Sequence, residues 1–431
     1  MTGLSPRGHC RRPAGVLGAL AVAGVLVIAG TATGAAASPQ PVSGAQDLYG
    51  VACPTATSCT AVGQNVDGET VSVTDGTPDV AQEVSGTFQL WGVACPDASP
   101  CVAVGVNTTD QGMVVAVTGG NPGDPRAVSG NVTLTGVACP GSGTCEAVGW
   151  DTSGYGDILP ISGGAPGTPV EVDGVGQLFG VACSGAGTCE AAGDNSAGGV
   201  VVTIGSGTAG VPHWVPGTES LTAVACPTAD TCVAVGLDTA SNEAVVVPIS
   251  DGAPGTAQAI PGVEALYGIA CPSAGTCEAV GESISGGVVL PITNGIAASP
   301  QAVSGSVDLR GIACPAEATC DAVGSATPPG GGATDGVLVT ITPTGATPTP
   351  TATPSPTAAA TTTASAGATA SPSSSAVATS SPTPRGAAGG HSGGGTPIGL
   401  IVLLLVVAAA VLAGGGIWLV RRRATGGNAG G

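Results

Sequence analysis

Paired cysteines are the residues of this 431-residue chain whose type and spacing most clearly allow chemistry. Cys10 stands alone near the N-terminus, and every later cysteine belongs to a pair in which five residues separate the two partners. Such a pair could bind a metal ion, exchange thiols and disulfides, or form a structural disulfide. The pairs are Cys53 and Cys59, Cys95 and Cys101, Cys139 and Cys145, Cys183 and Cys189, Cys226 and Cys232, Cys271 and Cys277, and Cys314 and Cys320.

The residues around these pairs favour the structural disulfide. Zinc sites prefer roughly two to four residues between cysteines and further Cys or His nearby, but His213 is the only histidine in the repeated part of the chain. Redox cysteines prefer C-x-x-C spacing and nearby positive charge, and Arg126 and Arg310 are the only cations there. We therefore predict one disulfide within each pair, in an oxidising compartment.

Successive cysteine pairs are 42–45 residues apart, which defines a sequence repeat. This period matches one four-stranded blade of a β-propeller. Gly, Pro, Thr and Val dominate the units, and the 3.6-residue apolar period of helical repeats is missing. In the sixth unit we expect strands at 266–271, 277–281, 288–292 and 301–305. The predicted fold class is all-β, with a seven-bladed propeller ectodomain, a disordered stalk and one C-terminal transmembrane helix.

Proline in the third strand predicts how the fourth strand pairs. Pro160, Pro248 and Pro291 occupy the same place in three of the units. Proline has no N–H to donate to a neighbouring strand. We therefore predict that the fourth strand pairs with the third only in part, or at a bulge.

The two ends of the repeat region predict a closed ring. The segment "SPQPVSG" (38–44) resembles "SPQAVSG" (299–305), which carries a fourth strand, and it precedes the first unit. The last unit ends at "VLVTITP" (337–343) without a fourth strand of its own. We expect Pro41–Gly44 to supply that strand, which joins the first and last blades and removes two open edges.

An acidic residue follows the second cysteine in four units, at Glu146, Glu190, Glu278 and Asp321. These four acids could form a partial ring around a cation such as calcium. They could equally be strand residues near a solvated end of the blade. No other cofactor or metal site is predicted.

The unit "L-x-G-[VI]-A-C-P-x4-C-x-A-V-G" resembles the BNR or Asp-box-like propeller repeats of secreted bacterial proteins, in a cysteine-bearing form found at the actinobacterial cell surface. The resemblance covers residues 38–342 and implies the propeller fold. Those repeats carry "D-G-G-x-T-W" after the third strand, whereas "TDGTP" (74–78) and "SDGAPG" (250–255) stand here without the Trp. The resemblance therefore implies the fold and does not extend to an activity.

The ends of the chain predict membrane anchoring. A basic start, an apolar centre and three alanines make residues 1–37 a secretory signal peptide. Residues 343–396 are rich in Thr, Ser, Pro, Ala and Gly and read as a stalk. Residues 397–420 contain no charge and are long enough to span a bilayer. Three arginines open the tail at 421–431, which places the C-terminus in the cytoplasm and the N-terminal ectodomain outside.

Charge and residue types limit the function of the exported part. It contains three arginines, Arg126, Arg310 and Arg385, against 28 acidic residues, a formal charge of −25. This excludes nucleic acid and anionic lipid as partners. We expect a binding or scaffold protein whose partner is a protein or a cell-wall glycan, with no catalytic residues.

The alternative function is a degenerate or divergent glycan-processing hydrolase of the propeller class. An axial pocket that joins Arg126 or Arg310 to clustered acids would indicate it. Tyr49 and Tyr267 share one strand position and are interpreted as structural residues rather than nucleophiles.

Overall fold

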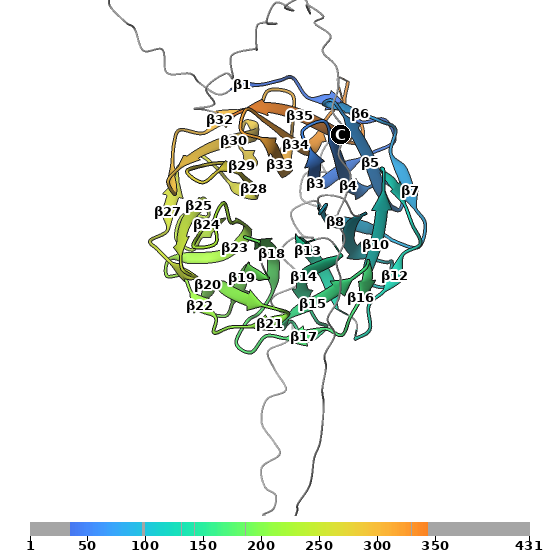
Figure 1. Ribbon diagram of the computed structural model, residues 1–431. Coiled ribbons are helices and arrows are strands. Elements are labelled where there is room, and N and C mark those ends of the chain that lie inside the picture. Colours follow the sequence, from blue (N-terminus) through green and yellow to red (C-terminus); the bar gives the residue numbers. More distant parts are fainter. Residues whose placement is uncertain are drawn as a thin grey trace, which may run out of the picture. The chain divides into compact units, whose positions relative to one another are not determined.

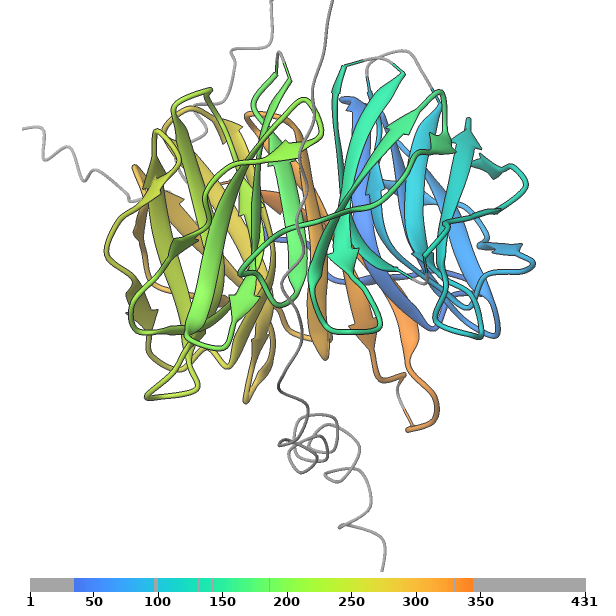
Figure 2. The ribbon, with the colours of Figure 1, turned by 90° about the horizontal axis from the view of Figure 1, so that it is seen from below.

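The computed structural model describes residues 35–343 except 97–99, 131, 142, 186 and 329. Seven separate antiparallel sheets form blades around a central opening (Figure 1). Loops lie at both ends of the ring, and the strands run between them (Figure 2). The predicted seven-bladed all-β propeller is confirmed.

The predicted transmembrane helix at 397–420 and tail at 421–431 lie outside the described residues. So do all but the last three residues of the predicted signal peptide and all but the first residue of the predicted stalk. Within the described range, no helix is both long enough and apolar enough to cross a membrane.

Each blade consists of an inner, a middle and a third strand, followed by two short outer pieces. The inner strands are β3 (Asp47–Thr55), β8 (Gln89–Ala94), β13 (Thr133–Gly141), β18 (Leu178–Cys183), β23 (Thr218–Ala225), β28 (Ala265–Ser273) and β33 (Asp308–Ala316). The middle strands are β4 (Ser58–Gln64), β9 (Cys101–Val106), β14 (Thr144–Trp150), β19 (Thr188–Asn195), β24 (Thr231–Asp238), β29 (Thr276–Ser283) and β34 (Thr319–Ala326). The third strands are β5 (Gly68–Thr74), β10 (Gly112–Thr118), β15 (Gly156–Ser162), β20 (Gly198–Gly205), β25 (Ala244–Ser250), β30 (Gly286–Thr293) and β35 (Asp335–Thr342).

The outer strand is broken where the sequence predicts it. In blades 1 to 6 its pieces are β6 (Thr77–Pro78) and β7 (Gln82–Val84), β11 (Asn121–Pro122) and β12 (Arg126–Ala127), β16 (Ala165–Pro166) and β17 (Val170–Glu171), β21 (Thr208–Ala209) and β22 (His213–Trp214), β26 (Ala253–Pro254) and β27 (Gln258–Ile260), and β31 (Ile296–Ala297) and β32 (Gln301–Ala302). Ile249 pairs with β26 and Val246 with β27, so Pro248 lies between the two ladders. Its carbonyl accepts a hydrogen bond from the Gly255 N–H at 2.7 Å, and its missing N–H leaves no donor unpaired.

The N-terminal segment closes the ring, as predicted. Strands β1 (Ala35–Ala36) and β2 (Gln40–Pro41) both pair with β35 of blade 7. The Val42 N–H then donates to the Gly336 carbonyl at 2.8 Å. The outer strand therefore begins earlier than the predicted Pro41–Gly44 and ends near Val42, and β1 lies inside the predicted signal peptide.

The core is divided among the blade interfaces. Each of the seven apolar clusters draws its side chains from two neighbouring blades. Val, Leu, Ile and Ala fill these clusters, and Leu48, Leu90 and Leu134 are among the largest fully buried side chains. Burying such small residues on both faces of every blade replaces one large core with many thin ones.

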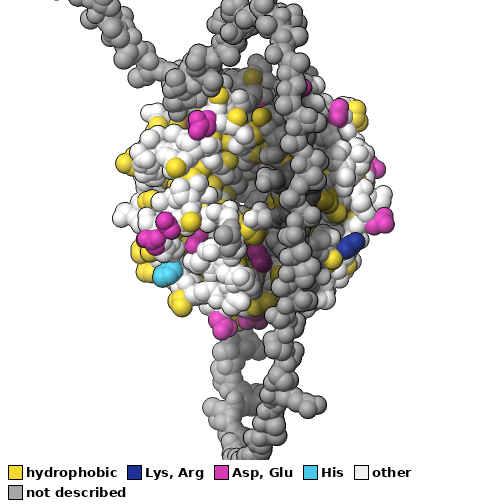
Figure 3. Space-filling model, viewed as in Figure 1, with side chains coloured by type: hydrophobic (Ala, Val, Ile, Leu, Met, Phe, Trp, Pro, Cys, Tyr) yellow, Lys and Arg dark blue, Asp and Glu magenta, His cyan; other side chains and the backbone are white. Residues whose placement is uncertain are grey.

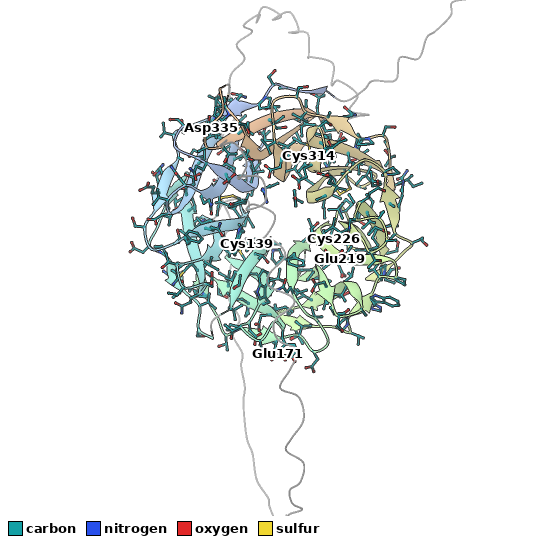
Figure 4. All side chains as sticks on the ribbon, turned by 180° about the vertical axis from the view of Figure 1, so that it is seen from behind. Cys139, Glu171, Glu219, Cys226, Cys314 and Asp335 are labelled. Carbon is teal, nitrogen blue, oxygen red and sulfur yellow. A yellow bond between two sulfur atoms is a disulfide. The ribbon has the colours of Figure 1, made fainter. Side chains whose placement is uncertain are left out.

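All predicted disulfides within the pairs are present. Each joins the end of an inner strand to the start of the following middle strand, six residues on. We call this end of the ring the disulfide end. Figure 4 shows Cys139, Cys226 and Cys314 beside the central opening.

Candidate functional site

Every inner strand carries a β-bulge at the residue that follows its buried leucine. In blade 1, Leu48 pairs with Gly63 and Gly50 pairs with Val62, so Tyr49 is the extra residue. The other blades show the same register shift. Bulges re-aim side chains out of the regular ladder. We call the bulged residues the mouth ring: Tyr49, Trp91, Thr135, Phe179, Thr222, Tyr267 and Arg310.

The mouth ring surrounds one end of the central channel, which we call the mouth end. A cavity of about 160 Å³ at the axis is lined by Phe179, Thr222, Tyr267 and Arg310 and by the small residues that follow each bulge. A Cβ added at Gly311 would meet the Tyr49 carbonyl oxygen at 2.7 Å. Glycine therefore allows the inner strands of blades 7 and 1 to approach closely around this cavity.

Arg310 is held between two aromatic rings. Its guanidinium carbon lies 5.5 Å from the ring centroid of Tyr49 and 5.0 Å from that of Tyr267. An Arg310 N–H donates to Asp308 Oδ2 at 2.6 Å, and the Ser325 hydroxyl donates to the other Asp308 oxygen at 2.7 Å. Two ring faces and one carboxylate therefore fix this cation.

The two tyrosines of this arrangement stay protonated at neutral pH. Burial, reinforced by Asp47, raises the pKa of Tyr49 to about 12. Burial also raises the pKa of Tyr267, whose hydroxyl donates to Glu282 at 2.5 Å. The sequence-based interpretation of both residues as structural is incomplete, because Tyr267 lines the axial cavity and both rings contact Arg310.

Aromatic residues are concentrated at the mouth end. The chain has two Phe, three Tyr and four Trp, and all except Trp418 lie in described residues. Beyond the mouth ring, Trp150 meets Phe179 edge-on with centroids 5.8 Å apart. The Trp214 indole N–H donates to the Ala197 carbonyl in a hairpin between middle and third strands, which lies at the same end. The remaining two, Phe88 and Tyr155, lie beside Val106 and in the hairpin that begins at Asp151.

The disulfide end has a different lining. A cavity of about 360 Å³ at the axis is lined by the Val, Ile, Ala and Cys residues of the inner strands. A second cavity of about 200 Å³ lies between blades 5 and 6 and includes Pro248, Cys232 and Cys277. Neither lining contains an Asp, Glu, His, Lys or Arg among the described residues.

The four acids predicted as a partial ring lie at four different blade interfaces. Glu190 accepts a hydrogen bond from the Thr203 hydroxyl at 2.8 Å, and Asp321 accepts one from Thr340 at 3.0 Å. Asp321 also lies 3.6 Å from Cys59 Sγ of blade 1, but that sulfur is already in a disulfide. Glu190, Glu278 and Asp321 are buried and Glu146 is half-buried, so these positions are not at a fully solvated end either. The structure does not bring the acids together, and calcium binding stays a prediction.

Burial raises the pKa of three of these acids, Glu146, Glu190 and Asp321. The hydroxyl hydrogen bonds to Glu190 and Asp321 lower the pKa and offset part of that rise. The hydroxyl of Thr60 takes the equivalent place in blade 1, 3.7 Å from Cys101 Sγ of blade 2. In blades 7 and 1 the position therefore packs a polar side chain beside the next blade's disulfide.

Glu69 is a buried acid that the sequence analysis did not single out. Its side chain is fully buried, and neither carboxylate oxygen has a hydrogen-bond partner. Burial, with Glu83 and Asp47 nearby, raises the pKa of Glu69 to about 8. Asp157 holds the equivalent place in blade 3, where burial raises its pKa to about 6. The sequence does contain a signal for these buried acids: both are charged residues near the start of a third strand, where the other blades have Val or Met.

Comparisons with known proteins support the fold. The WD40 propeller domain of Doa1 has a TM-score of 0.50 at 12% identity, covering 70% of this chain and 96% of that one. YCF48 bound to D1 peptide has a TM-score of 0.50 at 13% identity, covering 74% and 97%. Kuenenia stuttgartiensis hydrazine synthase has a TM-score of 0.52 at 14% identity, covering 65% and 93%. No protein-family model and no curated protein matches the chain. At these identities the likeness shows the β-propeller fold alone.

Proposed function

We propose that this chain is a membrane-anchored binding propeller of the bacterial cell surface, built from cysteine-bearing BNR or Asp-box-like repeats of the actinobacterial type. In this proposal the signal peptide exports the chain, the helix at 397–420 anchors it, and the stalk at 343–396 holds the propeller away from the membrane. The ligand binds at the mouth end of the channel.

The single observation that carries the binding proposal is the composition of the mouth ring. Aromatic residues make up 2% of the chain, yet Tyr49, Trp91, Phe179 and Tyr267 occupy the same bulged position of four inner strands. Of these, Phe179 and Tyr267 line the axial cavity, and Tyr49 contacts Arg310, which also lines it. The leucine before each bulge is the same in every blade, whereas the bulged residue varies. Blade packing therefore does not dictate the bulged residue. Clustered aromatic side chains supply most of the energy in many binding sites.

The charge of the surface agrees with an extracellular binding role. Acidic side chains are scattered over the face visible in Figure 3, where basic side chains are rare. YCF48, one of the solved structures with the same fold, is bound to a peptide. A protein segment is therefore the first class of ligand to test, and a cell-wall glycan is the second.

Capture experiments with matched variants test this proposal. Full-length chain in detergent would be incubated with cell-wall fractions and secreted proteins, beside a Trp91→Ala/Phe179→Ala variant. The control is Thr57→Ala/Glu317→Gln, which changes two exposed side chains in disulfide-end hairpins. A ligand retained by the wild type and the control but lost by the mouth variant supports the proposal. A ligand retained equally by all three contradicts it.

The glycan-processing hydrolase remains the second candidate, because Arg310 lines an axial cavity and binds Asp308. Two observations weigh against it: Arg310 is already paired, and burial raises the pKa of Tyr49 and Tyr267, which opposes activation of either hydroxyl as a nucleophile. Hydrolysis of fluorogenic glycosides, abolished by Asp308→Asn, would favour the hydrolase. We assign no catalytic residue.

A further inference from the structure

The mouth ring contains three positions that lie between aromatic neighbours. In blade order the ring reads Tyr49, Trp91, Thr135, Phe179, Thr222, Tyr267 and Arg310, and blade 7 adjoins blade 1. Each of Thr135, Thr222 and Arg310 therefore has an aromatic residue on both neighbouring blades. We call these three places the slots of the mouth ring.

Arg310 shows which group a slot accommodates. It fills the slot between Tyr267 and Tyr49 with a guanidinium that faces both rings and binds a carboxylate. This is an internal example of a cation recognised by two aromatic faces and one acid.

The other two slots contain a short side chain whose hydroxyl is bound to strand carbonyls. The Thr222 hydroxyl donates to the Leu266 carbonyl at 2.6 Å and lies 3.1 Å from the Val235 carbonyl. The Thr135 hydroxyl approaches the Leu178 and Val148 carbonyls in the same way, at 2.9 Å and 3.3 Å. Both threonines therefore satisfy strand carbonyls and leave the space between the rings unfilled by their own side chains.

Of the two threonine slots, only the one at Thr222 combines the axial cavity with nearby carboxylates. Phe179, Thr222 and Tyr267 line the same cavity. Arg310 covers the Tyr267 ring from blade 7, and Thr222 belongs to blade 5, which adjoins blade 6 on its other side (Figure 1).

The carboxylates come from three neighbouring blades. Glu219 precedes Thr222 on β23 and is exposed. Asp194, the last residue but one of β19 in blade 4, accepts the Gln177 N–H at 3.0 Å and interacts electrostatically with Glu219. Glu282 in blade 6 is bound to the Tyr267 hydroxyl. At the Thr135 slot the residues equivalent to Glu219 and Asp308 are Val132 and Thr133, so that slot lacks this charge.

We infer that the slot at Thr222 binds the guanidinium of an arginine side chain on a partner protein, between Phe179 and Tyr267 and beside Glu219. The inference rests on the proposed binding function of the mouth end and names its ligand chemistry. An anionic group does not suit the slot, because Arg310, the one cation near it among the described residues, is already paired with Asp308.

Binding of short peptides to the full-length chain in detergent tests the inference. The probe is an uncharged-terminus peptide with one arginine between glycines, and its matched control replaces arginine by citrulline, which has the same shape without the charge. Lysine in the same place distinguishes a guanidinium from any cation. Titration would be followed by NMR of the peptide.

We expect the arginine peptide to bind about tenfold more tightly than the citrulline peptide. Phe179→Ala, which leaves the protein charge unchanged, should remove that difference, and Glu219→Gln should reduce it. Glu317→Gln, at the disulfide end, should leave it unchanged. Equal binding of the two peptides, or an arginine preference that survives Phe179→Ala, would overturn the inference.

The outcome is separable from that of the proposed function. If the capture experiment shows a ligand lost with Trp91→Ala/Phe179→Ala while the arginine peptide gains nothing over citrulline, the mouth end binds and the guanidinium assignment is wrong. If the peptide preference is present and no captured ligand depends on the mouth variant, the slot exists and the proposed function fails.

Discussion

The mouth end and the disulfide end of this propeller are built by the same repeated strands but differ in chemistry. At the disulfide end every blade presents the same Val/Ile-Ala-Cys lining and the same short disulfide. At the mouth end the corresponding residues are aromatic, threonine or arginine, and they lie on bulges. The lining is therefore constant from unit to unit at the disulfide end, whereas the bulged residues at the mouth end vary.

The difference between the two ends explains how a chain with few aromatic residues can have an aromatic binding site. Thin cores of valine and alanine hold each interface, and a disulfide adds to the stability of every blade. The described aromatic residues are therefore not needed to fill these cores, and they lie at the mouth end. Stability and binding therefore depend on separate ends of each strand, and substitutions should separate them.

The largest expected effect comes from the disulfides. A closed loop of this size stabilises by about 2.4 kcal/mol in the chain-entropy model, so reducing all of them removes more than the roughly 5–15 kcal/mol stability of a typical domain. We expect full reduction to unfold the propeller, measured by circular dichroism. Cys271→Ala/Cys277→Ala alone should lower the free energy of unfolding by about 2 kcal/mol. A fully reduced chain that keeps its strand signal would contradict the role assigned to the disulfide end.

A smaller effect is expected where the inner strands meet around the mouth. Gly311→Ala places a Cβ 2.7 Å from the Tyr49 carbonyl oxygen, and the strands must separate. We expect a loss of about 1–3 kcal/mol in urea unfolding. Gly141→Ala at the disulfide end has open space around its Cβ and should change stability by less than about 0.5 kcal/mol. Equal effects of the two substitutions on the free energy of unfolding would show that the close approach of the inner strands at the mouth does not contribute to stability.

Glu69 gives a pH-dependent effect at the mouth end. Its pKa rises from 4.5 to about 8 on folding, so the folded chain holds a proton that the unfolded chain has lost. The free energy of unfolding should therefore fall as pH rises from about 4.5 to about 8. Glu69→Gln should remove this fall and be more stable than wild type by about 1–3 kcal/mol at pH 8, with little difference at pH 4.

Urea unfolding between pH 4 and pH 9 measures the Glu69 effect, with the exposed Glu317→Gln as its control. A Glu69→Gln variant that keeps the same pH slope as wild type would mean that another group titrates in this window.

The sequence predicted the features that depend on spacing along one chain. The cysteine intervals predicted the blades and the pairing, and Pro248 predicted the break in the outer strand, because each follows from local geometry. The direction of Tyr49 and Arg310 could not be predicted, because a bulge depends on register between two strands. The burial of Glu69 also depends on neighbours distant in the sequence. The early start of the closing strand at Ala35 was missed because no repeat precedes it.

The central claim is that the mouth end binds the ligand, and hydroxyl-radical footprinting of the chain in its own cell envelope tests this most directly. The reference is the purified full-length chain, and oxidation of each aromatic residue would be measured by mass spectrometry. We predict that Trp91 and Phe179 become protected in the envelope. Tyr155 and Trp214, which are 50% and 51% exposed at the same end but outside the mouth ring, should react equally in both samples. Unchanged reactivity of Trp91 and Phe179, with ligands present, would contradict the account.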